Sequence, residues 1–202
     1  MRAIMTDCPP LILASTSRYR RELLERLRLP FTVEAPGVDE TAGPGETPPE
    51  LARRLALAKA RAVAQRHPQA VVIGSDQVAD LDGAAIGKPG THAVATEQLL
   101  RMSGRRVVFQ TALAVVCAAT GFESVDLAAV TVQFRTLSPE EVERYLRLDE
   151  PYDCAGSARS ESLGVALLEA IHSDDPTALV GLPLIRTAAL LRRAGLDVLA
   201  AR

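Results

Sequence analysis

The chain has 202 residues, of which 48% are hydrophobic and 24% are charged. Its 23 Lys and Arg against 25 Asp and Glu leave a net charge of -2, which excludes a protein that coats nucleic-acid polymers, because such a protein needs a clearly basic surface. Aromatic residues are only 3% and Trp is absent, so the core must be aliphatic and no extended aromatic platform can stack single strands. The length predicts one soluble globular domain, residues 1–202.

The cysteines and the N-terminus indicate the compartment. Cys8, Cys117 and Cys154 have neither the even count of a disulfide framework nor the spacing of a metal site. They are therefore predicted to be reduced, small core residues. No stretch is long and apolar enough for a signal peptide or a membrane span. We expect a cytoplasmic protein without membrane contact, in which residues 1–10 form a poorly ordered extension.

The first half of the chain alternates strand and helix signals. Short apolar runs favour strands, and leucines that recur on one face favour a helix. A capping box formed by Thr47 and Glu50, with Pro early in the first turn, opens a long helix. In chain order we expect a strand at 11–14, a helix at about 18–28, a strand at 31–34, a flexible loop at 36–49, a helix to about 66, and a buried strand at 71–73 that ends in Gly74-Ser75-Asp76.

The second half opens with turn signals at Asp82-Gly83 and Gly87-Lys88-Pro89. Two long β-like runs then read as a hairpin, and the stretch 162–171 is ambiguous between helix and strand. We expect a helix near 92–102, the hairpin strands at 107–117 and 122–134, a helix from 138 to about 148, a loop at 150–162, and a helix at 183–194. Together these elements predict an α/β fold with a mixed sheet flanked by helices.

The segment Ser15–Arg21 is the first candidate site. Arg18, Arg20 and Arg21 crowd the predicted start of a helix, where the helix dipole disfavours cations. Such a break of a local rule is enriched at functional sites. Free backbone N–H groups and the Ser and Thr hydroxyls of the same turn would cradle a phosphate. The alternative interpretation is an ordinary solvated face of arginines.

Two acidic residues, Asp76 and Glu161, are further candidates for a functional site. Asp76 follows a buried strand, a position where α/β sheets bind ligands, and it could be a general base, a metal ligand or simply a turn residue. Glu161 is the only acid in the glycine-containing stretch 154–164, which could bind a ligand. Lys59 and Lys88 add positive charge, although each alone reads as a surface lysine. These patterns indicate a phosphate-binding α/β protein with an acidic catalytic candidate.

Read together, the segments resemble the Maf family of nucleoside triphosphate pyrophosphatases over about residues 11–196. Each fragment is weak by itself, but the ordered set is specific. The matching fragments are LILASTSRYRRELLERL, VDET, LAKARAVA, GSDQVADLDG, GKP, EPYDCAGSARSESLG and DDPTALVGLPL. The resemblance implies a Maf/ITPase-like fold, in which a twisted mixed sheet carries two lobes around a central cleft.

Three positions are similar to the branch of the family that acts on 7-methyl-GTP: Tyr19, Gln77 and Glu161. The branch that acts on dTTP and UTP carries Arg, Thr and Gln there. In the 7-methyl-GTP branch the first position is commonly Trp, so Tyr19 is a conservative departure. Methylation at N7 makes guanine cationic, and a cation gains about 0.5–2 kcal/mol on an aromatic face. Guanine also presents two neighbouring N–H donors, which one carboxylate can accept, whereas uracil and thymine suit an amide.

The resemblance also implies a mechanism, namely metal-assisted hydrolysis between the α- and β-phosphates that releases 7-methyl-GMP and pyrophosphate. Asp76 would be the general base, and Glu40 with Asp76 would hold a divalent cation, Mg²⁺ or Mn²⁺. The triphosphate would be bound by Ser15, Ser17, Arg20, Lys59 and Lys88.

Two alternatives stay open from the sequence: a dTTP/UTP pyrophosphatase, and a non-catalytic nucleotide-binding regulator of septum formation. For the enzyme, the family suggests the removal of noncanonical nucleotides before they enter RNA or DNA. A homodimer is expected from the family and from the frequency of twofold dimers.

Overall fold

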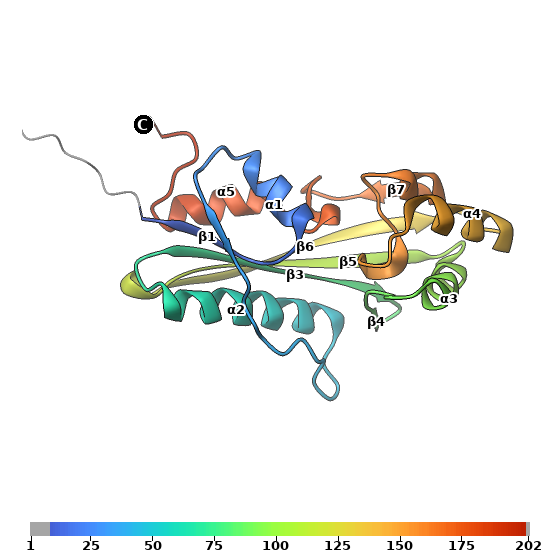
Figure 1. Cartoon of the computed structure of the whole chain (residues 1–202), viewed down its shortest axis with the longest axis horizontal. Helices are drawn as coiled ribbons and strands as arrows, with labels where there is room; N and C mark the ends of the chain where they lie inside the picture. Colours follow the sequence, from blue (N-terminus) through green and yellow to red (C-terminus); the bar gives the residue numbers. More distant parts are fainter. Residues whose placement is uncertain (1–8, 201–202) are drawn as a thin grey trace, which may run out of the picture.

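The computed structural model describes residues 9–200. A seven-stranded mixed sheet runs along the molecule in the order β2-β1-β3-β5-β6-β7, and β4 pairs with β3 beside this path. Figure 1 shows three long strands, β3, β5 and β6, spanning most of its length. The strands are β1 (Leu11–Ala14), β2 (Thr32–Glu34), β3 (Val71–Leu81), β4 (Ala84–Ile86), β5 (Arg106–Cys117), β6 (Phe122–Phe134) and β7 (Leu168–His172).

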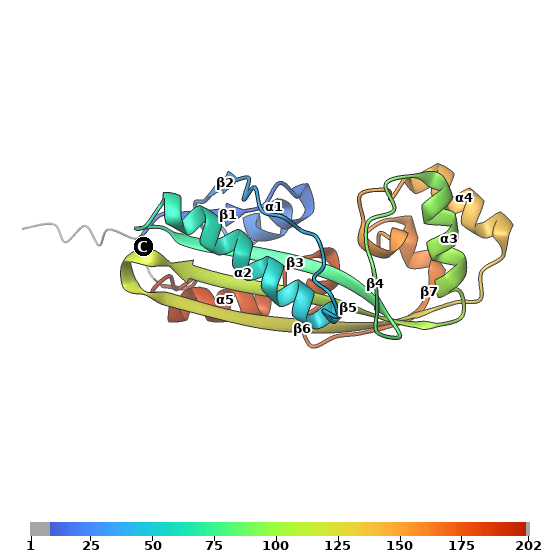
Figure 2. The ribbon, with the colours of Figure 1, turned by 90° about the horizontal axis from the view of Figure 1, so that it is seen from below.

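The helices form layers on both faces of the sheet and a separate group at one end of it. In Figures 1 and 2, α2 covers one face, α1 and α5 cover the other, and α3 and α4 gather with β7 beyond them. Their bounds are α1 (Arg18–Glu25), α2 (Pro48–Arg66), α3 (His92–Met102), α4 (Pro139–Asp149) and α5 (Leu184–Arg193). The α/β architecture with a mixed, helix-flanked sheet is confirmed.

The pleat of the central strands separates the core into one cluster on each face of the sheet. Side chains of successive strand residues point to opposite faces, so Val72 packs with the α2 layer, whereas Val71 and Ile73 pack with the α1 and α5 layer. A third cluster joins α3 and α4 to the far ends of β5 and β6. These clusters build the two lobes visible in Figure 2, and they leave the cleft between them, as expected.

The predicted hairpin is confirmed, because β5 and β6 pair antiparallel from Cys117↔Phe122 to Arg106↔Gln133. Gly121 in the connection has φ +67, a left-handed conformation that glycine adopts at little cost. Similarly, β1 pairs in parallel with β2 and β3, as the alternation of strands and helices suggests.

Other boundaries differ from the sequence prediction. The first helix ends at Glu25 rather than near Arg28, because the N–H groups of residues 26–28 bond to the carbonyls three positions back instead of four, and Arg28 then takes a left-handed φ of +55. The ambiguous stretch 162–171 contains both a 3-10 helix (Leu163–Leu167) and β7, and the short β4 was not predicted. Of the predicted N-terminal extension, residues 1–8 lie outside the described residues, and the Pro10 carbonyl accepts a hydrogen bond from the Val71 N–H at 2.8 Å.

Candidate active site

A cavity of about 840 Å³ lies between the two lobes. Its wall is formed by the start of α1, the loop after β2, one side of α2, the middle of β3, β4 with the loop after it, the loop at 153–161 and the segment 179–181 before α5. The structure therefore brings together segments that are far apart in the chain. All ten residues singled out from the sequence line this cavity: Ser15, Ser17, Tyr19, Arg20, Glu40, Lys59, Asp76, Gln77, Lys88 and Glu161.

The cavity opens where β1 stops and β3 continues. Ala14, the last residue of β1, pairs with Gly74, and β3 then runs on to Leu81 because β5 continues to pair with it. The prediction that Asp76 follows the end of its own strand is therefore wrong, since a distant antiparallel partner extends that strand. Asp76 instead lies two residues beyond the end of β1, where the sheet edge is free to face a ligand.

The alternation of β3 sends neighbouring side chains to different partners. Ser75 points toward the α5 side, where its hydroxyl donates to the carbonyl of Gly181 at 2.9 Å. Asp76 points toward α2, and its Oδ1 lies 2.7 Å from the Nζ of Lys59. The helix can come this close because residue 74 is glycine: a Cβ there would lie 2.2 Å from the carbonyl oxygen of Ala56.

Lys59 joins two carboxylates at one point of the cavity. Its Nζ lies 2.7 Å from Asp76 Oδ1 and 2.8 Å from Glu40 Oε1, and its side chain is 5% exposed. Partial burial disfavours the ionised form of Glu40, but the hydrogen bond and charge of Lys59 outweigh this and hold the pKa of Glu40 below its usual 4.5; Lys88 and Arg20 act in the same direction. We call Arg20, Glu40, Lys59 and Asp76 the lysine cluster.

The start of α1 supplies further donors. Ser17 is the N-cap of the helix, and its hydroxyl accepts from the Arg20 N–H at 3.4 Å, while the Ser15 hydroxyl accepts from the Ser17 N–H at 3.1 Å. The guanidinium of Arg20 is anchored by its Nε, which donates to the Gly181 carbonyl at 2.9 Å. Burial lowers the pKa of Arg20, although Asp76 and Glu40 favour its charged form. The N–H groups of Ser17 and Arg20 are thus not free as predicted, because the hydroxyls of Ser15 and Ser17 already accept from them.

A loop before α5 braces these groups through its backbone. Asp175, 1% exposed, accepts hydrogen bonds from the N–H groups of Ile185 and Arg186 and from Thr177. The carbonyl groups of this loop face the cavity. The Gly181 carbonyl accepts hydrogen bonds from Arg20 and Ser75, and the carbonyls of Ala178 and Leu179 accept from the amide of Gln77.

Gln77 is a further predicted residue of the site. Its Nε2 donates to the carbonyls of Ala178 and Leu179 at 3.0 and 2.9 Å and lies 2.9 Å from the Thr111 hydroxyl. Carbonyl oxygens only accept, so the nitrogen of the amide must face this loop. The Oε1 atom is then the group that Gln77 has left for a ligand, and it is an acceptor.

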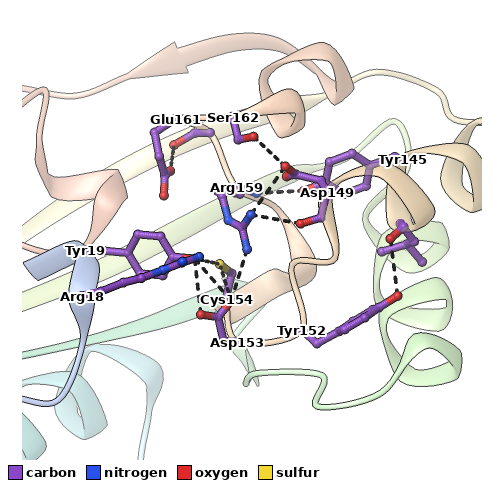
Figure 3. A network of polar contacts seen from close by, with 12 residues as sticks. Arg18, Tyr19, Tyr145, Asp149, Tyr152, Asp153, Cys154, Arg159, Glu161 and Ser162 are labelled. Carbon is purple, nitrogen blue, oxygen red and sulfur yellow. Dashed lines mark hydrogen bonds and ion pairs between the residues drawn. The ribbon is translucent and has the colours of Figure 1, made fainter.

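Around Tyr19, side chains from both lobes meet (Figure 3). The Tyr19 hydroxyl lies 3.3 Å from Asp153 Oδ2, and it accepts from Arg18 Nη2 at 2.7 Å. Guanidinium carbons of Arg18 and Arg159 lie 4.7 and 5.7 Å from the centroid of the ring. Partial burial opposes ionisation of Asp153, but the Cys154 thiol and the charge of Arg159 hold its pKa below 3.8. We call Tyr19, Asp153, Cys154, Arg159 and Glu161 the tyrosine cluster.

The loop that carries Glu161 is tied to the end of α4. The Arg159 N–H donates to the Tyr145 hydroxyl at 3.0 Å, and its Nη1 donates to the Asp149 carbonyl at 3.0 Å. Ser162 donates to Asp149 Oδ1 at 2.6 Å. Glu161 itself is exposed, with its carboxylate 3.4 Å from the Ser160 hydroxyl. The loop is thus held on both sides of Glu161 while the carboxylate stays accessible.

The cysteines follow the core prediction only in part. Cys117 is buried, but Cys154 is partly exposed and lines the cavity, so for Cys154 the prediction is wrong. Cys154 lies in the loop after α4, which lines the cavity, whereas Cys117 lies at the end of strand β5 in the core. Cys8 lies outside the described residues.

Asp153, Arg159 and Asp175 were missed from the sequence. The loop containing Cys154 was singled out there, and the opposite charges at 153 and 159 were the available signal that it holds an ion pair. The carboxylate of Asp175 is followed by Thr177, a spacing typical of a local turn. Neither signal indicates which distant side chain would be contacted.

The site offers limited ligands for a metal. Between residues 9 and 200, no group of three or more His, Cys, Asp or Glu side chains gathers closely enough to hold an ion. However, oxygens of Asp76 and Glu40 converge on the single cation of Lys59, so these two hard oxygen donors can face one positive charge. In the same part of the chain, no helix has the length and hydropathy needed to cross a membrane.

Comparison with known proteins gives consistent results. The model of the Maf family, described as Maf-like protein, matches residues 10–194. A 7-methyl-GTP pyrophosphatase of Polaromonas sp. (strain JS666) is 66% identical over 99% of this chain and 91% of its own length. Enzymes with the same name from Albidiferax ferrireducens and Bordetella pertussis are 65% and 59% identical, each over 95% of this chain and over 96% and 95% of their own lengths.

Among solved structures, a HAM1 protein from Coxiella burnetii aligns with a TM-score of 0.46 and 18% identity, over 63% of this chain and 73% of its own. The family model spans nearly all of the described chain, and the named relatives match 95–99% of it. The chain therefore belongs to the Maf family.

Proposed function

We propose that this protein hydrolyses 7-methyl-GTP to 7-methyl-GMP and pyrophosphate. The observation that carries the proposal is the cavity itself: one space is lined by the lysine cluster and by Tyr19, Gln77 and Glu161. A triphosphate and a cationic purine would each find complementary groups there. The names of the relatives, which are 59–66% identical, support the same substrate.

The triphosphate would lie against the lysine cluster and the start of α1. Arg20, Lys59 and Lys88 carry the charges that offset the phosphates, and the hydroxyls of Ser15 and Ser17 add neutral donors. Because Arg20 is partly buried and its Nε is already bonded to Gly181, its guanidinium is oriented before the substrate arrives. Such preorganisation lowers the cost of positioning the substrate.

Asp76 would act as the general base. Its Oδ1 is held by Lys59, so Oδ2 is the atom that would accept a proton from the attacking water. The water oxygen forms a bond to phosphorus as the bridging bond between the α- and β-phosphates breaks, and pyrophosphate leaves with the electron pair of that bond. Asp76 therefore keeps one oxygen on the ammonium of Lys59 and offers the other to the water.

A divalent cation fits the donor set. Asp76 and Glu40 would hold it, since two carboxylates together with phosphate oxygens and water suit Mg²⁺ or Mn²⁺. When bound, the ion would neutralise charge on the triphosphate and polarise its phosphoryl oxygens.

The base would be recognised by its charge and its hydrogen-bond edge. Tyr19 already lies close to two guanidinium groups, which indicates that its ring suits a planar cation. Glu161 can accept the two neighbouring N–H donors of guanine, and Gln77 Oε1 is a second fixed acceptor. A pyrimidine with acceptors on both sides of one N–H would leave such acceptors unpaired.

Steady-state turnover of 7-methyl-GTP, GTP, UTP and dTTP by the purified chain, with and without Mg²⁺ or Mn²⁺, tests the proposal. We expect 7-methyl-GTP to give the highest kcat/KM, and we expect release of pyrophosphate only when a cation is present. Equal or better turnover of UTP would instead support the dTTP/UTP branch. Tight binding of 7-methyl-GTP without turnover in any metal would support a nucleotide-binding regulator.

A further inference from the structure

Tyr19 and Asp153 meet across the cleft from opposite lobes. Tyr19 lies in the first turn of α1, whereas Asp153 lies in the loop whose neighbours Tyr152 and Ala155 pack on the α3 and α4 core. The phenol oxygen is 3.3 and 3.4 Å from the two carboxylate oxygens. This contact joins residues 134 positions apart in the chain, so it connects the two walls of the cavity directly.

The direction of the hydrogen bond follows from the other partner of the phenol. Arg18 Nη2 lies 2.7 Å from the same oxygen and can only donate to it. The hydroxyl proton of Tyr19 is therefore free to point at Asp153, whose carboxylate only accepts. A phenylalanine ring at this position could make the same stacking contacts but not this bond.

Asp153 is itself held in place. Arg159 Nη2 lies 3.4 Å from its Oδ1, and the Cys154 thiol donates to the same oxygen at 3.4 Å. Arg159 is in turn anchored by its Nη1 on the Asp149 carbonyl at 3.0 Å. The chain of contacts thus runs from the end of α4 through Asp153 to the hydroxyl of Tyr19, as Figure 3 shows.

We infer that Asp153 is a positioning residue for base recognition: its carboxylate accepts the Tyr19 hydroxyl and fixes the ring as the platform on which the substrate base stacks. The inference rests on the proposed hydrolysis of 7-methyl-GTP. The distances of 3.3–3.4 Å are at the long end for such a bond, and bonds of this kind commonly tighten when a substrate closes the site. Asp153 acts on binding through Tyr19 and leaves the lysine cluster, which performs the hydrolysis, unchanged.

A competing role for Asp153 would be direct attraction of the cationic base by its negative charge. The two roles predict different results for Asp153→Asn, which replaces the carboxylate by an amide. The carboxamide oxygen of Asp153→Asn still accepts the Tyr19 hydroxyl, but the side chain carries no charge. If Asp153 positions the ring, Asp153→Asn retains most of the function that Asp153→Ala loses.

The experiment is steady-state hydrolysis of 7-methyl-GTP at saturating Mg²⁺ by the full chain and its Asp153→Ala, Asp153→Asn, Tyr19→Phe and Tyr19→Phe/Asp153→Ala variants. We expect Asp153→Ala and Tyr19→Phe each to raise KM by about threefold to tenfold, the range of one hydrogen bond, with kcat within about twofold of the parent. The double variant should match the singles, because both remove the same bond. Glu169→Ala, an exposed carboxylate of β7 away from the cavity, is the matched control.

The outcomes separate this inference from the proposed function. An unchanged KM in Asp153→Ala, a KM in Asp153→Asn as high as in Asp153→Ala, or additive effects in the double variant would each overturn the positioning role, while leaving 7-methyl-GTP hydrolysis by the parent intact. A parent chain that fails to hydrolyse 7-methyl-GTP would overturn the proposed function instead. A fall in kcat with KM unchanged would place Asp153 in the chemical step and also overturn the inference.

Discussion

The lysine cluster and the tyrosine cluster line the same cavity but are built differently. The lysine cluster stands on α1, α2 and β3, apart from the loop residue Glu40, whose side chain is 57% exposed. The contacts around Lys59 are 2.7–2.8 Å, and the Lys59 and Asp76 side chains are only 5% and 9% exposed. The tyrosine cluster depends on a loop, its side-chain contacts to Asp153 are 3.3–3.4 Å, and the Asp153 side chain is 56% exposed. Lys59 and Asp76 are held by the packing of α2 on the sheet, whereas the tyrosine cluster is held by contacts between partly exposed side chains.

This difference in burial suits the two roles proposed for the clusters, hydrolysis for the lysine cluster and base recognition for the tyrosine cluster. Lys59 and Asp76 are buried between a helix and the sheet and can change only with the packing around them, so this pair suits a reaction that must keep one geometry. Loop side chains can be exchanged at small cost to the core. A family that keeps the hydrolysis and varies the base would be expected to vary the tyrosine cluster.

Replacing Asp76 tests the lysine cluster most severely. Asp76→Asn preserves the shape of the side chain and can still accept from Lys59, but the amide cannot take a proton from water. We expect kcat for 7-methyl-GTP to fall by about 10²–10⁴, the usual contribution of a general base, while KM changes little. Steady-state kinetics and equilibrium binding of the nucleotide measure the two effects.

The control for this change is Asp80→Asn, which lies four residues along the same strand and does not line the cavity. Its activity should match that of the parent. If Asp76→Asn kept full turnover, the general base would have to be another group, and the division between the two clusters would lose its main support.

The close approach of α2 to β3 is tested by Gly74→Ala. The new Cβ would lie 2.2 Å from the Ala56 carbonyl oxygen and 2.7 Å from the Ala60 nitrogen. Because both are helix backbone atoms, α2 must move as a unit, and overpacking of this kind costs about 1–3 kcal/mol or more. We expect a loss of about 3 kcal/mol in the free energy of unfolding, measured by urea denaturation, together with weakened activity because Lys59 moves with the helix.

Gly87→Ala provides the comparison, since a Cβ there meets nothing within 4 Å and no left-handed φ is required. Its unfolding free energy should stay close to that of the parent. Equal stability of the two variants would mean that the position of Lys59 does not depend on this contact.

The sequence predicts most of the elements of the fold, and the reasons are local. Leucine spacing and a capping box mark helices α1 and α2, and the turn around Gly121 marks the hairpin. What failed depends on distant partners. The strand after Val71 continues past Gly74 because the distant β5 pairs with it as far as Asp80 and β4 pairs with its last three residues, and no pattern near Gly74 reports the pairing with β5.

The site shows the same limit. The crowding of Arg18–Arg21 and the acid at 76 can be read from neighbouring residues, and the family resemblance joins them to Lys59 and Glu40. Asp153 and Asp175 act through contacts to Tyr19 and to the backbone before α5, so their importance appears only when the chain is folded. The family resemblance identifies Tyr19, Gln77 and Glu161 as the positions that recognise the base, but it does not identify the residues that contact them.

Glu161→Gln probes the tyrosine cluster with a smaller expected effect. The change replaces an acceptor-only carboxylate by an amide with both a donor and an acceptor, so one N–H of guanine would lose its partner. We expect the ratio of kcat/KM for 7-methyl-GTP to that for UTP to fall by about tenfold, in keeping with one unpaired polar group. Glu169→Gln should leave this ratio unchanged. A preserved ratio in Glu161→Gln would remove Glu161 from the reading of the base.

The Cys154 thiol reports the environment of the tyrosine cluster with the least disturbance. Burial raises the pKa of this thiol above its usual 9.0, and the negative charge of Asp153 adds to the shift. A raised pKa leaves the thiol neutral at pH 7, so alkylation by iodoacetamide should be slow there and should increase through pH 9 and beyond, because the thiolate is the nucleophile. Peptide mass spectrometry follows Cys154 separately, with the buried Cys117 as an internal control.

Asp153→Ala should shift this pH profile toward lower pH, because it removes a charge that disfavours the thiolate, and saturating 7-methyl-GTP should slow the reaction, because Cys154 lines the cavity. Alkylation at pH 7 as fast as that of a free cysteine would mean that the loop exposes the thiol to water. The tyrosine cluster would then be open in solution, and its contrast with the lysine cluster would be larger than the distances indicate.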